Sequence, residues 1–418
     1  MDILQHIENL PIEIVTQDRV LATAPAERFL IPFSDNVKRA DPLLCKTPED
    51  TVCLLSQGWL SGSNPEGLAD SPGIPWLLKS ADRGESWEVL PFEMTPAGGN
   101  VQAFGILRDG TMLVTFEAPV PEGITPWRDE MRAKLYESNP DLNRSLNGYF
   151  VSRSTDGGQT WTAGEEIDSR PFHSLSSLSI ILELPDGTLL LTANGRYGTH
   201  TIDITTGERL PPEKTGIFEH VLRSTDGGRT WPELHPLVTH AAETRLFRLP
   251  SGKILASIRA QSPFLDEPPL TGATIGSAWD DDDGHWMPPP GVDASAKQSG
   301  QKRMWIAESD DDGRTWNRLR QAVFGGEESP GEIHRLDDGH LLLITGDRGD
   351  PGGIWAHVSN DDSRTWDPRI IILRRYEPPR SPDYPSSVIF DDGTILTMTG
   401  LNQHNPAVAV RWQMPKDF

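Results

Sequence analysis

The sequence has few of the residues that several protein classes require. It contains two cysteines, Cys45 and Cys53, too few for a disulfide framework or for a zinc site without other ligands. No apolar run approaches the roughly 18 residues of a membrane-spanning helix. Positive charge is scarce, because 38 Lys and Arg stand against 61 Asp and Glu, a net charge of −23. A chain this acidic repels nucleic-acid phosphates and anionic lipids, so we expect neither nucleic acid nor membrane as a partner.

The start of the sequence also lacks the features of a secretion signal. It carries acidic residues and has neither a basic beginning nor an apolar stretch. We therefore expect a cytoplasmic protein, or a secreted one whose leader has been removed. Buried, reduced thiols are the expected state of Cys45 and Cys53.

Turn-forming residues, in contrast, are abundant, with 38 Gly and 36 Pro. An eight-residue pattern, Ser-x-Asp-x-Gly-x-Thr-Trp, occurs five times. Its copies begin at Ser80, Ser154, Ser224, Ser309 and Ser359, with Ser86 in place of Thr in the first and Ser363 in place of Gly in the last. Asp accepts hydrogen bonds from turn amides, and Gly supplies a positive φ. The pattern predicts hairpin turns whose Asp residues are structural rather than catalytic or metal-binding.

A second motif alternates with the first and consists of two apolar strands joined by a tight turn. Its turn glycines are Gly110, Gly187, Gly252, Gly339 and Gly393, and a sixth copy has Asp50 at this position. Each unit then has four strands, A to D, in which the tight turn joins A to B and the Asp pattern joins C to D. Six four-stranded units predict an all-β fold, a six-bladed β-propeller with antiparallel blades.

The last unit has only three strands before the sequence ends. They are expected near Ser386–Phe390, Ile395–Met398 and Ala407–Met414. We expect the fourth strand to come from the amino-terminal segment, around Ile12–Val15 or Val20–Ala24, which would close the ring. Residues 1–418 would then form a single domain.

Polar side chains recur where strands A begin and strands B end, and these points share one face of a propeller. Strand A beginnings carry Arg39, Glu243 and Tyr384, whereas Arg196, Arg259 and Arg348 lie at or just after strand B ends. The planar fork of Arg binds carboxylate through two parallel hydrogen bonds. This face is therefore predicted to hold a pocket for a carboxylate-bearing ligand. Long segments that follow strands B, residues 118–149, 198–219 and 260–302, should surround it.

These residues and motifs resemble the sialidase (neuraminidase) superfamily, six-bladed propellers with Asp-box, or BNR, repeats. The repeats and tight turns cover essentially the whole chain. They are more specific for the fold than for activity, because the same boxes occur in other carbohydrate enzymes and in binding proteins.

The resemblance extends to the family's catalytic pattern. Glu243 and Arg259 keep the family's spacing of sixteen residues, although Ala242 replaces an Asn. Tyr384 lies nine residues before a turn glycine, as the family's nucleophile does, with Pro385 in place of Ser.

Other positions match the family less closely. The third carboxylate-binding Arg of the family matches Arg348 only with a small insertion. The first matches Arg39 in an altered context, with Arg28 as a rival. Arg196 is a further candidate for binding the anion, and it could substitute for Arg39. The general acid of the family lies on the loop after the first strand B, where Asp70 is our candidate.

The resemblance implies a hydrolase for a terminal sugar that bears a carboxylate on its anomeric carbon. A neutral Tyr384 with Glu243 as its base avoids the repulsion that an anionic nucleophile would meet, an exception to the usual pair of carboxylates. Asp70, or Glu66 on the same loop, would protonate the leaving oxygen. The expected partner is a glycan, with no cofactor or metal. A propeller lyase for uronate-containing glycans and a non-catalytic glycan-binding propeller remain open, as does the oligomeric state.

Overall fold

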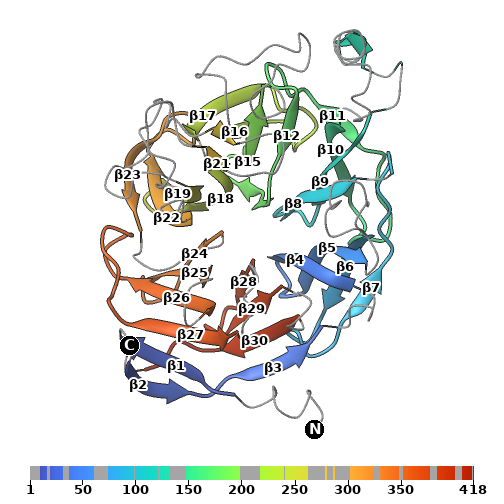
Figure 1. The fold of residues 1–418 in the computed structure, drawn as a ribbon. Helices are drawn as coiled ribbons and strands as arrows, with labels where there is room; N and C mark the ends of the chain where they lie inside the picture. Colours follow the sequence, from blue (N-terminus) through green and yellow to red (C-terminus); the bar gives the residue numbers. More distant parts are fainter. Residues whose placement is uncertain are drawn as a thin grey trace.

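The computed structural model confirms the predicted fold class. It describes residues 10–16, 19–31, 37–60, 74–97, 99–120, 123, 125–127, 129–130, 133, 147–197, 217–239, 241–261, 278–279, 286–287, 302–322, 330–347, 352–376, 384–400, 407–416 and 418. Six antiparallel β-sheets surround a central axis as the blades of a propeller (Figure 1).

Each blade begins near the axis and adds its strands outward (Figure 1). Blade 1 contains β4 (Val37–Lys46), β5 (Val52–Leu60), β6 (Ile74–Ser80) and β7 (Glu88–Leu90). Blade 2 contains β8 (Asn100–Ile106), β9 (Met112–Pro119), β10 (Asn147–Ser154) and β11 (Glu165–Ile167). Blade 4 contains β18 (Ala241–Arg248), β19 (Ile254–Gln261), β22 (Lys302–Ser309) and β23 (Asn317–Gln321). Blade 5 contains β24 (Glu332–Arg335), β25 (Leu341–Asp347), β26 (Gly353–Ser359) and β27 (Ile370–Arg375).

Blade 3 departs from the simple plan, because its first strand is interrupted. β12 (Ser174–Ser176) and β14 (Leu182–Glu183) both pair with β15 (Leu189–Arg196), which is followed by β16 (Phe218–Ser224) and β17 (Glu233–Thr239). The intervening β13 (Ser179–Ile180) pairs in parallel with β8 of blade 2. A short hairpin, β20 (Ala278–Trp279) and β21 (Trp286–Met287), lies in the segment that follows blade 4's second strand.

An amino-terminal strand closes the ring, as predicted, but the predicted segments were wrong. Blade 6 contains β28 (Ser386–Ile389), β29 (Ile395–Thr399) and β30 (Val408–Trp412), and its fourth strand is β3 (Glu27–Leu30). The segments we had expected there form β1 (Ile12–Thr16) and β2 (Arg19–Ala24), a hairpin on the outer edge of blade 5. There β1 covers the apolar edge strand β27, and Ile12 is fully buried.

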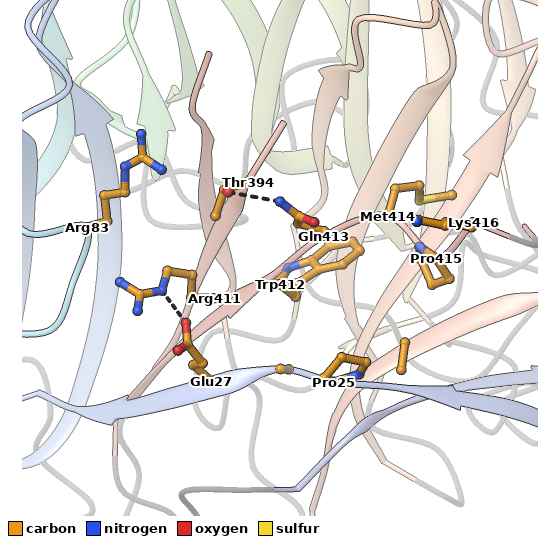
Figure 2. Close-up of a pocket in the computed structure, with 12 residues that line it drawn as sticks. Pro25, Glu27, Arg83, Thr394, Arg411, Trp412, Gln413, Met414, Pro415 and Lys416 are labelled. Carbon is orange, nitrogen blue, oxygen red and sulfur yellow. Dashed lines mark hydrogen bonds and ion pairs between the residues drawn. The ribbon is translucent and has the colours of Figure 1, made fainter. Parts of the chain in front are cut away.

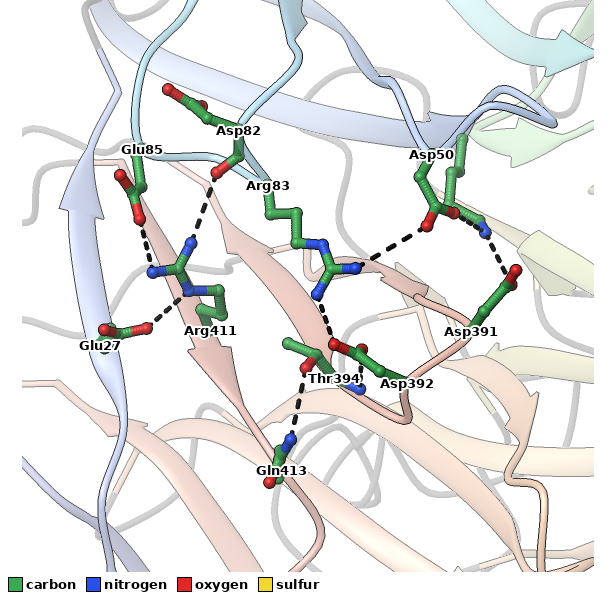
Figure 3. Close-up of polar contacts among 11 residues, drawn as sticks. Glu27, Asp50, Asp82, Arg83, Glu85, Asp391, Asp392, Thr394, Arg411 and Gln413 are labelled. Carbon is green, nitrogen blue, oxygen red and sulfur yellow. Dashed lines mark hydrogen bonds and ion pairs between the residues drawn. The ribbon is translucent and has the colours of Figure 1, made fainter.

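Ion pairs reinforce the outer edge of blade 6 and its seam with blade 1 (Figure 3). Arg411 of β30 donates to Glu27 of β3 at 2.6 Å and to Glu85 of the first Asp turn at 2.7 Å. Arg83 of that turn pairs with Asp392, in the tight turn of blade 6, at 2.6 Å. These groups are partly exposed, so each pair contributes about 1 kcal/mol or less.

The Asp turns have the geometry that their sequence predicts. In the second turn, Asp156 accepts from the amide of Thr160 at 2.9 Å and from the hydroxyls of Thr160 and Ser154. These bonds lower the pKa of Asp156 to about 2. Four of the turns also have a Trp Nε1 that donates to the carbonyl of the turn Gly. In the last turn Ser363 stands at that position, and its carbonyl accepts from Arg320 instead.

Candidate active site

Three of the predicted residues meet near the axis, from two blades that are not adjacent in the ring. Glu243 lies on β18 and Arg259 on β19 of blade 4, whereas Tyr384 directly precedes β28 of blade 6. The Tyr384 hydroxyl donates to Glu243 Oε1 at 3.0 Å. Arg259 Nη1 forms an ion pair with Glu243 Oε2 and donates to the Tyr384 hydroxyl at 3.5 Å. The structure thus joins a phenol, a carboxylate and a guanidinium.

A local irregularity of β18 directs Glu243 into this cluster. The pairing of β18 with β19 shifts register between Ala242 and Arg245, as in a β-bulge, and Ala242 stands opposite Arg259. Glu243 has a φ of +60°. For a residue with a Cβ this left-handed backbone costs roughly 1–2 kcal/mol. Bulges of this kind re-aim side chains next to active sites, and here the bulge places the carboxylate against both partners.

The cluster is largely shielded from solvent. Tyr384 is 5% and Arg259 8% exposed, whereas the Glu243 side chain is 19% exposed. The guanidinium offsets the charge of the carboxylate, and the carboxylate accepts the phenol proton. A carboxylate in this position can take the proton of the hydroxyl that it binds, and a hydroxyl that loses its proton becomes a nucleophile.

Arg196 lies in a second polar group, between blades 2 and 3. At the end of β15 it interacts with Glu117 of β9. Burial raises the pKa of Glu117 to about 7, and Arg196 and a hydrogen bond from Ser176 oppose this rise. Burial lowers the pKa of Arg196, and Glu117 opposes that change. The Arg196 carbonyl accepts from the ring Nδ1 and the backbone amide of His173, at 2.9 Å and 2.8 Å.

The side chains of three other predicted site residues, Arg39, Arg348 and Asp70, are not among those described. Arg39 lies on β4, where it pairs with Trp59 of β5, and only its backbone is described. Arg348 and Asp70 lie outside the described residues. Arg28, the rival of Arg39, sits on β3 at the outer side of blade 6, where it donates to the Leu373 carbonyl at 2.7 Å. Its position on an outermost strand separates it from the axial cluster.

Sequence reasoning missed two charged residues beneath the cluster, Arg245 on β18 and Glu332 on β24. Their side chains are 2% and 8% exposed and form an ion pair at 2.8 Å. A signal for them does exist in the repeats. Each lies seven residues before the turn glycine of its unit, and the six units carry Leu43, Ala103, Ile180, Arg245, Glu332 and Ser386 at this position.

A further buried carboxyl, Glu219 of β16, lies behind the Glu243 bulge. It is 1% exposed and interacts with Thr244, the residue after Glu243. Burial raises the pKa of Glu219 to about 8, although a hydrogen bond from the Thr244 amide opposes the rise. The Thr244 carbonyl accepts from the hydroxyls of Ser179, at 2.9 Å, and Thr192. Side chains of this region therefore hold Thr244, the bulge residue that follows Glu243.

A cavity of about 730 Å³ lies elsewhere, at the seam between blades 6 and 1 (Figure 2). It is lined by residues 24–27, where the chain passes from β2 to β3, by Thr394, by the segment from Arg411 to Lys416 and by Arg83 of the first Asp turn. That turn lies at the face opposite the strand B ends. Arg83 and Arg411 are already paired with carboxylates, so we do not assign this cavity to an acidic ligand.

In the described parts of the chain, no helix has the length and hydropathy to cross a lipid bilayer. Within the same ranges, no three His, Cys, Asp or Glu side chains form a group that could hold a metal ion.

Comparisons with known proteins bear on this geometry. No family model matches the chain. A curated sialidase from Bacteroides fragilis (strain YCH46) is 25% identical over 193 residues, which cover 44% of this chain and 33% of that protein. The match thus spans about a third of the relative's length.

Several solved structures share the architecture. Hadza microbial sialidase Hz136 has a TM-score of 0.62 at 15% identity, covering 96% of this chain and 72% of that one. The chain therefore shares its six-bladed propeller fold with this sialidase structure. The intramolecular trans-sialidase of Ruminococcus gnavus, solved with oseltamivir carboxylate, has a TM-score of 0.57 at 12% identity, covering 92% of this chain and 96% of that one. A protein of unknown function from Dyadobacter fermentans DSM 18053 has a TM-score of 0.64 at 19% identity, covering 96% and 100%.

Proposed function

We propose that this sialidase-type propeller is an exo-acting glycoside hydrolase that removes a terminal sugar bearing a carboxylate at its anomeric carbon. The observation that carries the proposal is the contact of Tyr384 with Glu243 and Arg259. A phenol bound to a base suits this substrate, because a carboxylate nucleophile would repel the sugar's own charge. The similarity to sialidases supports a glycoside hydrolase-like propeller.

In the proposed first step the Tyr384 oxygen bonds to the anomeric carbon and the glycosidic C–O bond breaks. The phenol proton passes to Glu243, and a general acid gives its proton to the leaving oxygen. Asp70 is our candidate for that acid. Water then attacks the anomeric carbon and gives a proton to the acid's conjugate base. The Tyr384 oxygen leaves and recovers its proton from Glu243.

Arginines would hold the substrate carboxylate during both steps. Arg259 is already at the cluster, and Arg39 and Arg348 are the candidates to complete the clamp through bidentate hydrogen bonds. Arg196, beside Glu117, is a candidate for a further polar contact to the sugar. A local group of arginines would also attract an anionic glycan to a protein of net charge −23.

The test is hydrolysis of a fluorogenic aryl sialoside by the wild type, Tyr384→Phe, Glu243→Gln and a control, Tyr376→Phe. Tyr376 and Tyr384 are both 5% exposed, so the control removes an equally buried hydroxyl. We expect Tyr384→Phe to lose on the order of 10³-fold or more in kcat/KM and Glu243→Gln roughly 10²–10⁴-fold. Tyr376→Phe should retain activity.

Two outcomes contradict the proposal. Absorbance of a new double bond on a uronate-containing glycan, without sialoside turnover, would indicate a lyase. Binding of glycans without turnover of either substrate would indicate a non-catalytic propeller.

A further inference from the structure

The Arg245–Glu332 ion pair is unusual in its depth. Arg245 is the bulkiest fully buried side chain in the described part of the protein, and Glu332 is 8% exposed. Burial alone would raise the pKa of Glu332, but Arg245, His334 and the Ser387 amide bring it below its ordinary value. A buried ion pair gives little stability, since apolar replacements of similar volume are often as stable.

The fold itself does not require charge at this level of the ring. The equivalent positions of blades 1 to 3 hold Leu43, Ala103 and Ile180. Leu43 and Ala103 are fully buried, so apolar side chains fill this level elsewhere. The charged pair joins blade 4, which also carries Glu243, to blade 5, which lies between blade 4 and the Tyr384 blade.

The pair holds the backbone that follows Tyr384. Arg245 Nη1 donates to the Pro385 carbonyl at 3.0 Å. Glu332 accepts from the Ser387 amide at 2.5 Å and from the Ser386 hydroxyl at 3.1 Å. Three successive residues after Tyr384 are therefore bound by side chains from blades 4 and 5.

The same pair is anchored next to Glu243. Arg245 follows Glu243 by two residues on β18, at the end of the register shift that gives Glu243 its left-handed backbone. A displacement of Arg245 would thus move the Glu243 bulge and the Tyr384 segment relative to each other. The distance of 3.0 Å between the Tyr384 hydroxyl and the Glu243 carboxylate depends on the positions of both the bulge and this segment.

We propose that Arg245 and Glu332 are positioning residues that set the Tyr384 hydroxyl against the Glu243 carboxylate. Neither touches the reacting atoms. The catalytic part of this inference rests on the proposed function, because it treats Tyr384 and Glu243 as the nucleophile and its base. Misplacement of reacting groups by about 1 Å can cost about 10²-fold in rate.

The test is an apolar double variant, Arg245→Met with Glu332→Leu, which avoids leaving either charge buried alone. The control is Arg223→Met with Glu233→Leu, an ion pair of 3.2 Å beside the Asp turn of blade 3. Melting temperatures and circular dichroism establish that both variants fold. A crystal structure of the first double variant then gives the Tyr384–Glu243 distance, and sialoside kinetics give kcat and KM.

We expect the double variant to fold with the Tyr384 hydroxyl beyond hydrogen-bonding distance of Glu243. Its kcat should fall by about 10-fold or more with KM changed much less, because the substrate contacts remain. The control should keep the wild-type kcat. A folded double variant with the 3.0 Å contact and an unchanged kcat would overturn the proposal.

If the double variant does not fold, Glu332→Gln replaces it, since the amide keeps the size and acceptor of the side chain. For Glu332→Gln, the Tyr384–Glu243 distance and kcat are measured in the same way, and they test the proposal by the same criteria. If the wild type hydrolyses no sialoside, the proposed function fails, and the structures alone decide whether the pair positions Tyr384. A lengthened contact supports positioning, and a retained one refutes it.

Discussion

Replacing Glu219 by Gln should alter how the stability of this protein depends on pH. Glu219 is 1% exposed, and its pKa is raised from 4.5 to about 8, chiefly by burial. Its cross-strand neighbour is Asn194. Asn194 Oδ1 and Glu219 Oε2 are both buried without a hydrogen-bond partner among the described residues. A proton on Glu219 would remove the charge from a buried carboxyl that has one oxygen without a partner, which agrees with the raised pKa.

The sign follows from proton binding. Between pH 4.5 and about 8 the folded protein keeps a proton on Glu219 that the unfolded chain releases. The free energy of unfolding therefore decreases as pH rises through this window, by about 1.4 kcal/mol per pH unit for this group. Once the pH exceeds the pKa of Glu219 in the folded protein, the total decrease in the free energy of unfolding is on the order of 5 kcal/mol. Gln is neutral at every pH and keeps an acceptor for the Thr244 amide.

The assay is urea unfolding followed by tryptophan fluorescence, at steps of pH across this window. We expect the stability difference, Glu219→Gln minus wild type, to rise with pH and to level off above the pKa of Glu219. Glu117, whose pKa is about 7, contributes equally to both proteins and cancels in the difference. Parallel curves for the two proteins would refute the assignment of a neutral, buried Glu219.

Two further predictions concern the seam between blades 6 and 1. Arg411→Gln removes the ion pairs to Glu27 and Glu85, so the free energy of unfolding should fall by about 2 kcal/mol or less. This decrease should be smaller in roughly 1 M salt, which screens the charges. A decrease that salt leaves unchanged would contradict an electrostatic origin. Leu54→Ala empties a fully buried position between these blades and should cost about 2–5 kcal/mol. In the same unfolding assay, the exposed control Val89→Ala should cost less than about 0.5 kcal/mol.

Much of the fold could be predicted because its signals are local. The bonds of Asp156 in its turn reach only four residues along the chain, to Thr160. The identity of the closing strand could not be predicted in this way. β1 and β3 are both short and carry apolar residues, and the choice between them depends on which blade edge each covers, β27 or β30.

The candidate site was predictable in part for a similar reason. Glu243, Arg259 and Tyr384 each lie a set number of residues from a turn glycine in the sequence. These sequence separations place all three at one face of the ring. Arg245 and Glu332 were missed because a charged residue on a strand usually indicates an exposed position. Only the ring arrangement of the blades reveals that these two charges are buried and face each other.

The closing strand also determines the order in which the molecule can be assembled. The side-chain bond from Arg411 to Glu27 joins residues 384 positions apart, whereas the bond from Ser56 to Asp41 within blade 1 spans 15. Closing the longer loop costs about 3 kcal/mol more chain entropy, so blade 6 should be completed late in folding. Because Tyr384 belongs to that blade and Glu243 to blade 4, the proposed catalytic pair would come into contact only once the ring has closed, and activity would report on molecules that have finished folding.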